Sequence, residues 1–178
     1  PRHPRLASGG ELAASAAALD NRGGDLDARH TLLRLGQGSL DNRGGEVRGR
    51  DTLIIQAGAG ANAGGLLASG SDLDLATPGQ ALDNRDGTIV AAGRLAMDSA
   101  AVDNAGGTLA ALDGDLAIAT HNGKLANASG AIQAGGQIAL ATGELDNRDG
   151  TIAGQDIAAA TGAIANAGGA IVAAATLG

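Results

Sequence analysis

The residues best suited to chemistry in this sequence are aspartates that lie outside its main repeat motif. Two convergent carboxylates can serve as acid and base on a glycosidic bond, and some parallel β-helices are polysaccharide-cleaving enzymes. The nine candidates are Asp25, Asp27, Asp51, Asp72, Asp74, Asp98, Asp113, Asp115 and Asp156. They are scattered through expected loops and strand edges, and no aromatic residue is present to stack against a sugar. A polysaccharide-cleaving enzyme is therefore only a remote alternative.

Metal or nucleophilic chemistry has even less support. The histidines His3, His30 and His121 share no repeat position, and the chain has no cysteine, whereas such sites need partners at defined spacing. The run from Gly23 to Asp27 lacks the nonapeptide pattern of calcium-binding β-rolls, and no phosphate-binding glycine loop ending in Lys-Ser or Lys-Thr occurs. We therefore predict no catalytic residue, no metal site and no cofactor.

The composition predicts a narrow core of small side chains. Glycine accounts for 31 of the 178 residues, and 44% of the chain is hydrophobic without any Phe, Trp or Tyr. The formal net charge is −7 and no basic stripe is present, which argues against a nucleic-acid partner. Alanine, leucine, isoleucine and valine suit a core of constant cross-section, so these numbers favour an elongated protein.

An asparagine recurs about every 21 residues and anchors an internal repeat. A glycine follows each asparagine three positions later, and an aliphatic residue follows five positions later. The asparagines are Asn21, Asn42, Asn62, Asn84, Asn104, Asn127, Asn147 and Asn166, and the glycines are Gly24, Gly45, Gly65, Gly87, Gly107, Gly130, Gly150 and Gly169. Eight copies without exception cannot come from composition alone. The repeat must therefore organise the fold.

The asparagine and the glycine together indicate a tight corner. Asparagine tolerates unusual backbone angles and can bond nearby backbone groups, and stacked asparagines form amide ladders. We expect the glycine three residues later to supply a positive φ, which only glycine adopts at low cost. On this reasoning, Gly87→Val or Gly107→Val should destabilise the protein strongly.

The apolar residues of each unit indicate short strands. A second apolar pair with one residue between its members follows the corner, for example Leu33/Leu35 and Leu53/Ile55. A spacing of two places both side chains on one face of a strand. One such unit cannot bury its apolar face alone, but it can when it stacks on a copy of itself. The pattern therefore predicts a solenoid.

Two alanine-rich tracts, Glu11–Asp20 and Asp156–Gly162, could form helices by propensity alone. Their register with the repeat instead favours strands. We therefore predict an all-β fold, a parallel β-helix or β-solenoid of about eight coils of roughly 21 residues. Residues 1–178 would form a single solenoid segment.

Charged residues flank the asparagine in four of the coils, which read Asp-Asn-Arg. The pairs are Asp20/Arg22, Asp41/Arg43, Asp83/Arg85 and Asp146/Arg148. Stacked coils would place like charges above one another, and opposite charges introduced together offset that repulsion. We interpret these flanks as a solvated ionic edge that contributes little to stability, and a functional acidic or basic strip is the alternative.

The corner motifs resemble those of a known family. The motif Leu-Asp-Asn-Arg-Gly-Gly occurs at 19–24 and 40–45, and Leu-Asp-Asn-Arg-Asp-Gly-Thr-Ile occurs at 82–89 and 145–152. They are similar to the filamentous-haemagglutinin-type repeats of large exoproteins that Gram-negative bacteria secrete by the two-partner route. Adhesins and the stalks of contact-dependent inhibition toxins belong to that group. The resemblance implies a right-handed parallel β-helix that is secreted or lies on the outer-membrane surface.

The resemblance also implies a structural role. The segment would be an internal fragment of a longer fibre, a shaft that projects a distal adhesive or toxic domain. Its partners would be the adjoining repeats of the same chain and an outer-membrane two-partner-secretion transporter during export. A host or neighbouring-cell receptor would be contacted through other regions. The alternative is an adhesive module that binds host glycan, matrix or sister fibres through one solenoid face.

Overall fold

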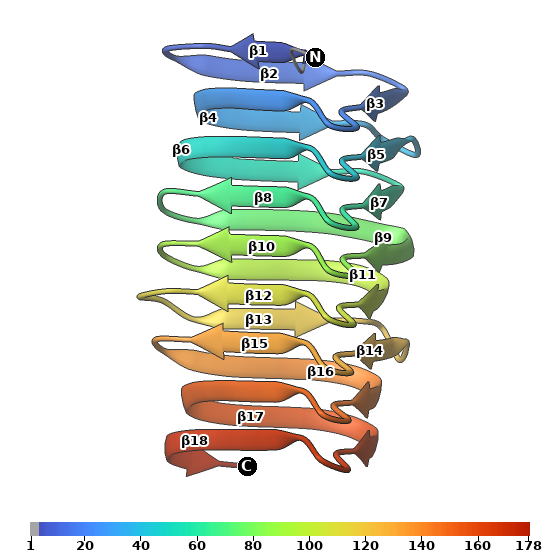
Figure 1. Ribbon diagram of the computed structural model, residues 1–178, viewed down its shortest axis with the longest axis vertical. Coiled ribbons are helices and arrows are strands. Elements are labelled where there is room, and N and C mark those ends of the chain that lie inside the picture. The colour runs from blue at the N-terminus through green and yellow to red at the C-terminus, as the bar shows by residue number, and fades with distance from the viewer. Residues whose placement is uncertain (1–3) are drawn as a thin grey trace.

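The computed structural model describes residues 4–178, which contain strands and no helix. The strands pair in parallel in one sheet that winds about nine times around a single axis, so the chain forms a β-solenoid (Figure 1). The predicted all-β solenoid is confirmed. Strands before Asn21 and after Asn166 raise the number of turns above the eight that the asparagines mark. Within the described residues, no helix has the length and apolarity needed to cross a membrane.

The strands vary in length because in some coils one strand continues through a corner, whereas in other coils the strand is interrupted there. They are β1 (Arg5–Ala7), β2 (Glu11–Ser15), β3 (Ala18–Asp20), β4 (Asp25–Arg34), β5 (Ser39–Asp41), β6 (Glu46–Gln56), β7 (Ala59–Ala61), β8 (Leu66–Ser69), β9 (Leu73–Asp83), β10 (Thr88–Ala91), β11 (Leu95–Asp103), β12 (Thr108–Ala111), β13 (Leu116–Ala119), β14 (Lys124–Ala126), β15 (Ala131–Ala134), β16 (Gln137–Asp146), β17 (Thr151–Ala165) and β18 (Ala170–Leu177). Strand β9, for example, pairs with the end of β6 and with β7.

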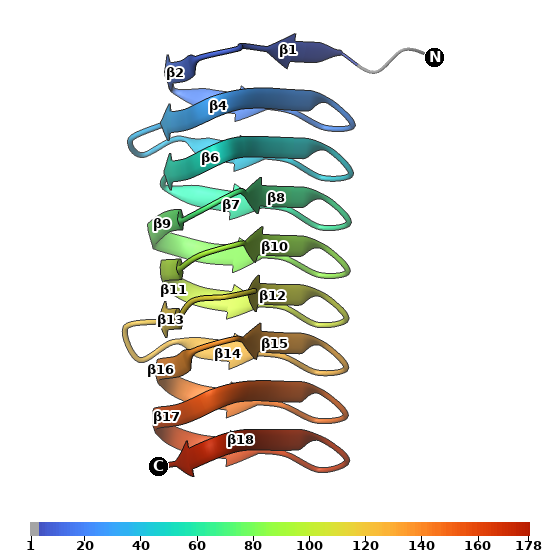
Figure 2. The same cartoon turned by 90° about the vertical axis from the view of Figure 1, so that its left-hand side faces the viewer.

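Equivalent positions of successive coils pair directly. Leu67 of β8 pairs with Ile89 of β10, which pairs with Leu109 of β12, and Leu109 pairs with Ile132 of β15. Neighbouring parallel strands lie about 4.8 Å apart, so each coil adds one such step to the solenoid. Figure 2 shows these strands one above another along the axis. The stacking makes neighbours of residues that are about one repeat apart in the sequence.

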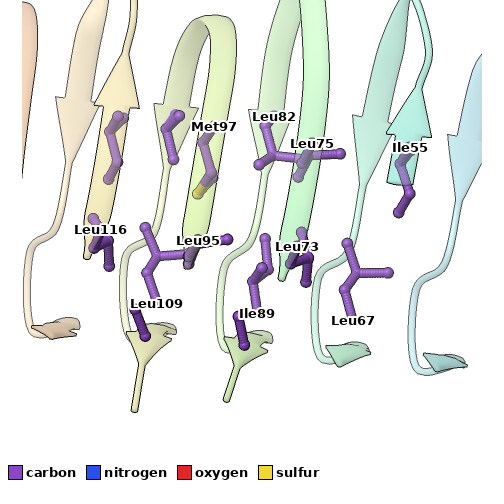
Figure 3. Packing of buried hydrophobic residues seen from close by; sticks show 14 of the residues in the cluster. Ile55, Leu67, Leu73, Leu75, Leu82, Ile89, Leu95, Met97, Leu109 and Leu116 are labelled. Carbon is purple, nitrogen blue, oxygen red and sulfur yellow. The ribbon is translucent and has the colours of Figure 1, made fainter. Parts of the chain in front are cut away.

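The core is a column of aliphatic side chains from every coil. In the coil that begins at Asn84, Ile89, Leu95, Met97 and Val102 are all at most 3% exposed. Figure 3 shows Ile89, Leu95 and Met97 beside the equivalent residues of the neighbouring coils. Burial of each such side chain contributes about 1.5–3 kcal/mol, so stability accumulates coil by coil.

The predicted alignment of one apolar pair is wrong by two residues. Leu33 pairs with Ile55 and Thr31 pairs with Leu53, so the pair equivalent to Leu53/Ile55 is Thr31/Leu33. Leu35 instead lies at the next inward position. Every second residue from 31 to 35 points inward, so spacing alone cannot select the right pair.

The inward position of Leu35 carries a hydroxyl in later coils, which the sequence analysis did not detect. Thr77 and Ser99 pair across coils, are fully buried, and their hydroxyl oxygens lie 2.6 Å apart. Thr120 donates from Oγ1 to the Gly123 carbonyl at 2.7 Å. Thr142 is 7% exposed, and its Oγ1 is the one buried side-chain polar atom of the described residues without a partner.

Both alanine-rich tracts form strands, as predicted. Residues 11–20 contain β2 and β3, and residues 156–162 lie within β17. Strand β17 pairs with β16 from Asp156 to Ala165. A parallel neighbour supplies the backbone hydrogen bonds along the tract, so the tertiary context overrides the helix propensity of alanine.

Candidate functional site

The repeated asparagines form one continuous ladder of side-chain amides. The Nδ2 atom of each donates to the Oδ1 atom of the asparagine one coil further along the chain. The seven bonds join Asn21 to Asn42, Asn42 to Asn62, Asn62 to Asn84, Asn84 to Asn104, Asn104 to Asn127, Asn127 to Asn147 and Asn147 to Asn166, at 2.6 to 2.7 Å. The structure thus brings all eight predicted asparagines together in a single column.

The first seven amides of the ladder also bond the backbone of two coils. Asn42 Nδ2 lies 3.2 Å from the carbonyl oxygen of Gly45 and 3.1 Å from that of Leu66 in the next coil. The backbone turn is closed by Gly45 N, which donates to the Asn42 carbonyl at 3.0 Å. Asn42 is fully buried, and buried polar groups must be paired because an unpaired one is costly. The ladder therefore satisfies the polar groups of the corner without water.

The predicted reason for the glycine at the corner is wrong. The positive φ lies two residues after the asparagine, for example at Gly44 (φ 62°) and at Asp86 (φ 55°). The glycine three residues after it is needed because another chain segment passes close by. A Cβ added at Gly87 would lie 2.7 Å from Asn84 Oδ1 and even closer to the Asn62 carbonyl oxygen of the preceding coil. The expected sensitivity to Gly87→Val stands, but its cause is steric.

The position of positive φ tolerates residues other than glycine. Asp86, Ser129 and Asp149 occupy it with φ near 55°. Aspartate and asparagine enter this region more readily than bulky residues because a short polar side chain can bond locally. The variation between Asn-Arg-Gly-Gly and Asn-Arg-Asp-Gly was the sequence signal that could have located the strained position.

A family comparison matches this chain along nearly its whole length. The model of the family described as haemagglutinin repeat matches residues 5–44, 32–78, 72–117 and 111–178. The chain belongs to the haemagglutinin repeat family. Comparison with curated proteins and with solved structures gave no match. Membership agrees with the resemblance found in the corner motifs and implies a filamentous adhesin-type exoprotein that is secreted or surface-located.

The acidic and basic flanks of this haemagglutinin repeat form ion pairs within the four Asp-Asn-Arg coils. Arg43 meets Asp41 through two contacts, at 2.6 Å from Nη2 to Oδ2 and 2.9 Å from Nε to Oδ1. Asp20 pairs with Asp41 in the stack, and Arg22 lies 3.7 Å from Asp41 as well as 2.6 Å from Asp20. The Arg22 side chain bonds to Asp20 and lowers the pKa of that carboxyl to about 2. Arg22 thus offsets the repulsion between the stacked Asp20 and Asp41, and Arg85 does the same between Asp83 and Asp103.

The sequence analysis missed Lys124, which contacts the last ionic corner from the preceding coil. Asp146 is 3% exposed and lies 2.7 Å from Arg148 and 3.0 Å from Lys124 of the preceding coil. Lys124 also lies 2.9 Å from Glu144. Arg148 first and Lys124 second lower the pKa of Asp146 well below its usual range. Lys124 is the only lysine of the chain, and its position one coil before the carboxylates was the available signal.

Seven of the nine scattered aspartates, all except Asp113 and Asp156, are held by backbone N–H groups or by basic side chains. Asp72 Oδ1 accepts from the Arg94 backbone N–H at 2.8 Å, and Asp115 Oδ1 accepts from that of Gln137 at 2.8 Å. His121 contacts Asp98. The remaining ion pairs of these acids are Asp25 with Arg5, Asp27 with Arg5 and Arg50, Asp51 with Arg29 and His30, and Asp74 with Arg94. These bonds link neighbouring coils.

The aspartates and histidines form no metal-binding cluster in the described residues. No group of three or more His, Cys, Asp or Glu side chains that could hold a metal occurs in residues 4–178. His3 lies outside these residues, and His30 and His121 lie on different coils. The haemagglutinin repeat is a structural adhesin repeat. The site that its sequence builds is therefore the asparagine corner, whose chemistry is hydrogen bonding between coils.

Proposed function

We propose that the chain is a section of the shaft of a filamentous exoprotein from a Gram-negative bacterium. The shaft holds a distal adhesive or toxic domain away from the cell. The observation that carries this proposal is the unbroken run of seven asparagine bonds, which joins the eight asparagine corners one to the next. A module whose coils repeat the same corner and a largely aliphatic core suits a repetitive mechanical role.

The geometry gives the shaft a definite length. About nine coils at about 4.8 Å each span roughly 43 Å. Interfaces between coils combine backbone pairing, aliphatic stacking and the amide ladder, so bending would break several kinds of contact at once. Stability that accumulates from neighbour to neighbour lets such a rod extend without a larger core.

The proposal includes export through an outer-membrane transporter of the two-partner type. A chain that crosses a membrane unfolded must fold afterwards, and this chain has no cysteine that oxidation could crosslink beforehand. Contacts between adjacent coils join residues that are only about one repeat apart in the sequence, whereas many contacts in a large globular protein join residues much farther apart. The solenoid can therefore form progressively as the chain emerges.

Deletion of one whole coil tests the shaft function in the full-length exoprotein. Removing residues 85–104 joins Asn84 to Ala105, so the phase of the repeat and the ladder are kept. Adhesion or toxin delivery should survive, and the extended length should fall by about 4.8 Å. Removing only residues 85–94 is the control, since it places the following asparagines out of the column and should abolish display of the folded fibre.

Two outcomes would contradict the proposal. Loss of activity from a folded, displayed fibre that lacks one whole coil would mean that the coil carries a specific function. Saturable binding of the 178-residue chain to cells or glycans, removed by substitutions on one face, would favour the adhesive module instead.

A further inference from the structure

One outer face of the solenoid has a hollow lined by alanine. It lies over β9, β11, β13, β16 and β17, which stack along the axis (Figure 1). Its volume is about 550 Å³. The outward alanines that line it are Ala76, Ala96, Ala117, Ala119, Ala139, Ala141, Ala158 and Ala160. The methyl side chain of alanine leaves the sheet backbone close to the surface over several coils. We call this surface the alanine hollow.

The alanines of the hollow form two columns of outward side chains that run along the axis. The same two columns carry long side chains in the preceding coils. Leu32 pairs with Ile54, and Ile54 pairs with Asp74, which continues into the column of Ala96 and Ala117. Leu32 and Ile54 alternate with buried residues and are partly exposed. In the second column, Arg34 pairs with Gln56, and both are exposed. We call Leu32, Arg34, Ile54 and Gln56 the ridge.

We propose that a second copy of this chain packs on the face, antiparallel to the first, with the ridge of each copy in the alanine hollow of the other. We call the strand segment that one coil contributes to this face a rung. The two-fold axis would lie along the strand direction, between the rungs that contain Asp74 and Ala96. Ile54 would then face the partner's Ala117, and Leu32 would face the partner's Ala139. Because the operation is two-fold, both contacts occur twice. The surface is separate from the asparagine corner, so the proposal does not depend on the shaft function.

Charge complementarity supports this register. Asp72 and Arg94 occupy the column beside the ridge, on the two rungs next to the proposed axis. The axis places Asp72 opposite the partner's Arg94, and Arg94 opposite the partner's Asp72. Asp74 and Asp98 come near one another across the interface, but each already has a cation or histidine from its own chain, Arg94 and His121. The axis thus places Arg94 opposite one carboxylate of the partner at the centre of the interface, in addition to the bond that Arg94 makes with Asp74 of its own chain.

The area is sufficient for a specific pair. Eight overlapping rungs at about 4.8 Å give about 38 Å along the axis, and a five-residue strand width gives about 17 Å. About 650 Å² per copy, or about 1,300 Å² in total, lies within the range of specific interfaces. Shape favours the same arrangement, since larger side chains meet alanine on the six central rungs and no aromatic residue is available to fill the hollow from within the chain.

Cysteine pairs test the proposed register, because the chain has no cysteine of its own. Ile54→Cys combined with Ala117→Cys places the two thiols three rungs apart, about 14 Å within one chain. That distance is too long for an intramolecular disulfide, which needs Cα atoms within about 7 Å. Mild oxidation should therefore give a covalent dimer. The matched control is Ala68→Cys with Gln133→Cys, which are also three rungs apart but lie outside the alanine hollow and the ridge.

Sedimentation of the cysteine-free chain provides the second measurement. The chain should sediment as a dimer, and Ala139→Arg should weaken dimerisation by at least about tenfold because it fills the hollow with a charge. Gln133→Arg on the same coil should leave dimerisation unchanged, and both variants should keep the melting temperature. A monomer up to the solubility limit would overturn the proposal. So would a dimer insensitive to Ala139→Arg, or equal crosslinking of the two cysteine pairs.

Discussion

Substitution of a central asparagine tests how much the ladder contributes to stability. Asn104→Ala removes the bond from Asn84 Nδ2 to Asn104 Oδ1 and the bond from Asn104 Nδ2 to Asn127 Oδ1, each 2.7 Å. It also removes bonds to the carbonyl oxygens of Gly107 and Ala131. Each bond contributes about 1 kcal/mol net, and a buried acceptor left without its donor costs about 1–3 kcal/mol more.

The expected loss for Asn104→Ala is therefore about 3–5 kcal/mol in the free energy of unfolding. For a chain of this size that corresponds to a fall in Tm of about 10 °C. Thermal and urea unfolding followed by far-ultraviolet circular dichroism at neutral pH measure both quantities. The reasoning depends on burial, because Asn127 Oδ1 has no access to water that could replace the lost donor.

The last asparagine of the ladder provides the matched control. Asn166 is exposed, accepts from Asn147 at 2.6 Å and donates to the Gly169 carbonyl at 3.3 Å. Water can replace these bonds, so Asn166→Ala should cost only about 1 kcal/mol. Equal losses for Asn104→Ala and Asn166→Ala, or a loss below about 1 kcal/mol for Asn104→Ala, would refute the role assigned to the buried ladder.

Three further predictions follow from the coil interior and the ionic edge. Gly107→Val should destabilise by about 3 kcal/mol or more, because its side chain would collide with an asparagine carbonyl of the preceding coil; an unchanged Tm would contradict this. Thr142→Val should be neutral or stabilising in urea unfolding, since the Thr142 hydroxyl has no partner, whereas Thr120→Val should cost about 1 kcal/mol. The lowered pKa of Asp146 contributes stability above the ordinary carboxyl pKa of 3.8, and this is lost as the pH falls toward the lowered value. Asp146→Asn should therefore lower Tm at neutral pH, and the Tm of this variant should fall less than that of the unmodified chain as the pH is lowered. An equally steep fall of Tm in acid would argue against the ion pair.

The repeat itself could be predicted from the sequence because it is a matter of spacing. The period near 21 residues, the asparagine with its glycine three positions later and the alternating aliphatic residues all concern neighbours along the chain. Such local patterns determine strands and corners, and a unit too small to bury its own apolar face must stack. The all-β solenoid, the column of corners and the strand conformation of Asp156–Gly162 could be anticipated on these grounds.

Contacts between coils were decided only by the tertiary structure. The glycine at Gly87 is required by a carbonyl of the preceding coil, and neither its φ nor its neighbours in the sequence reveal that collision. The pairing of Thr31 with Leu53 and the approach of Lys124 to Asp146 likewise depend on the relative phase of two coils. The repeat varies by a few residues in length, so this phase is fixed by packing and turn geometry. The alanine hollow has the same origin, because a surface shared by five strands exists only after the coils stack.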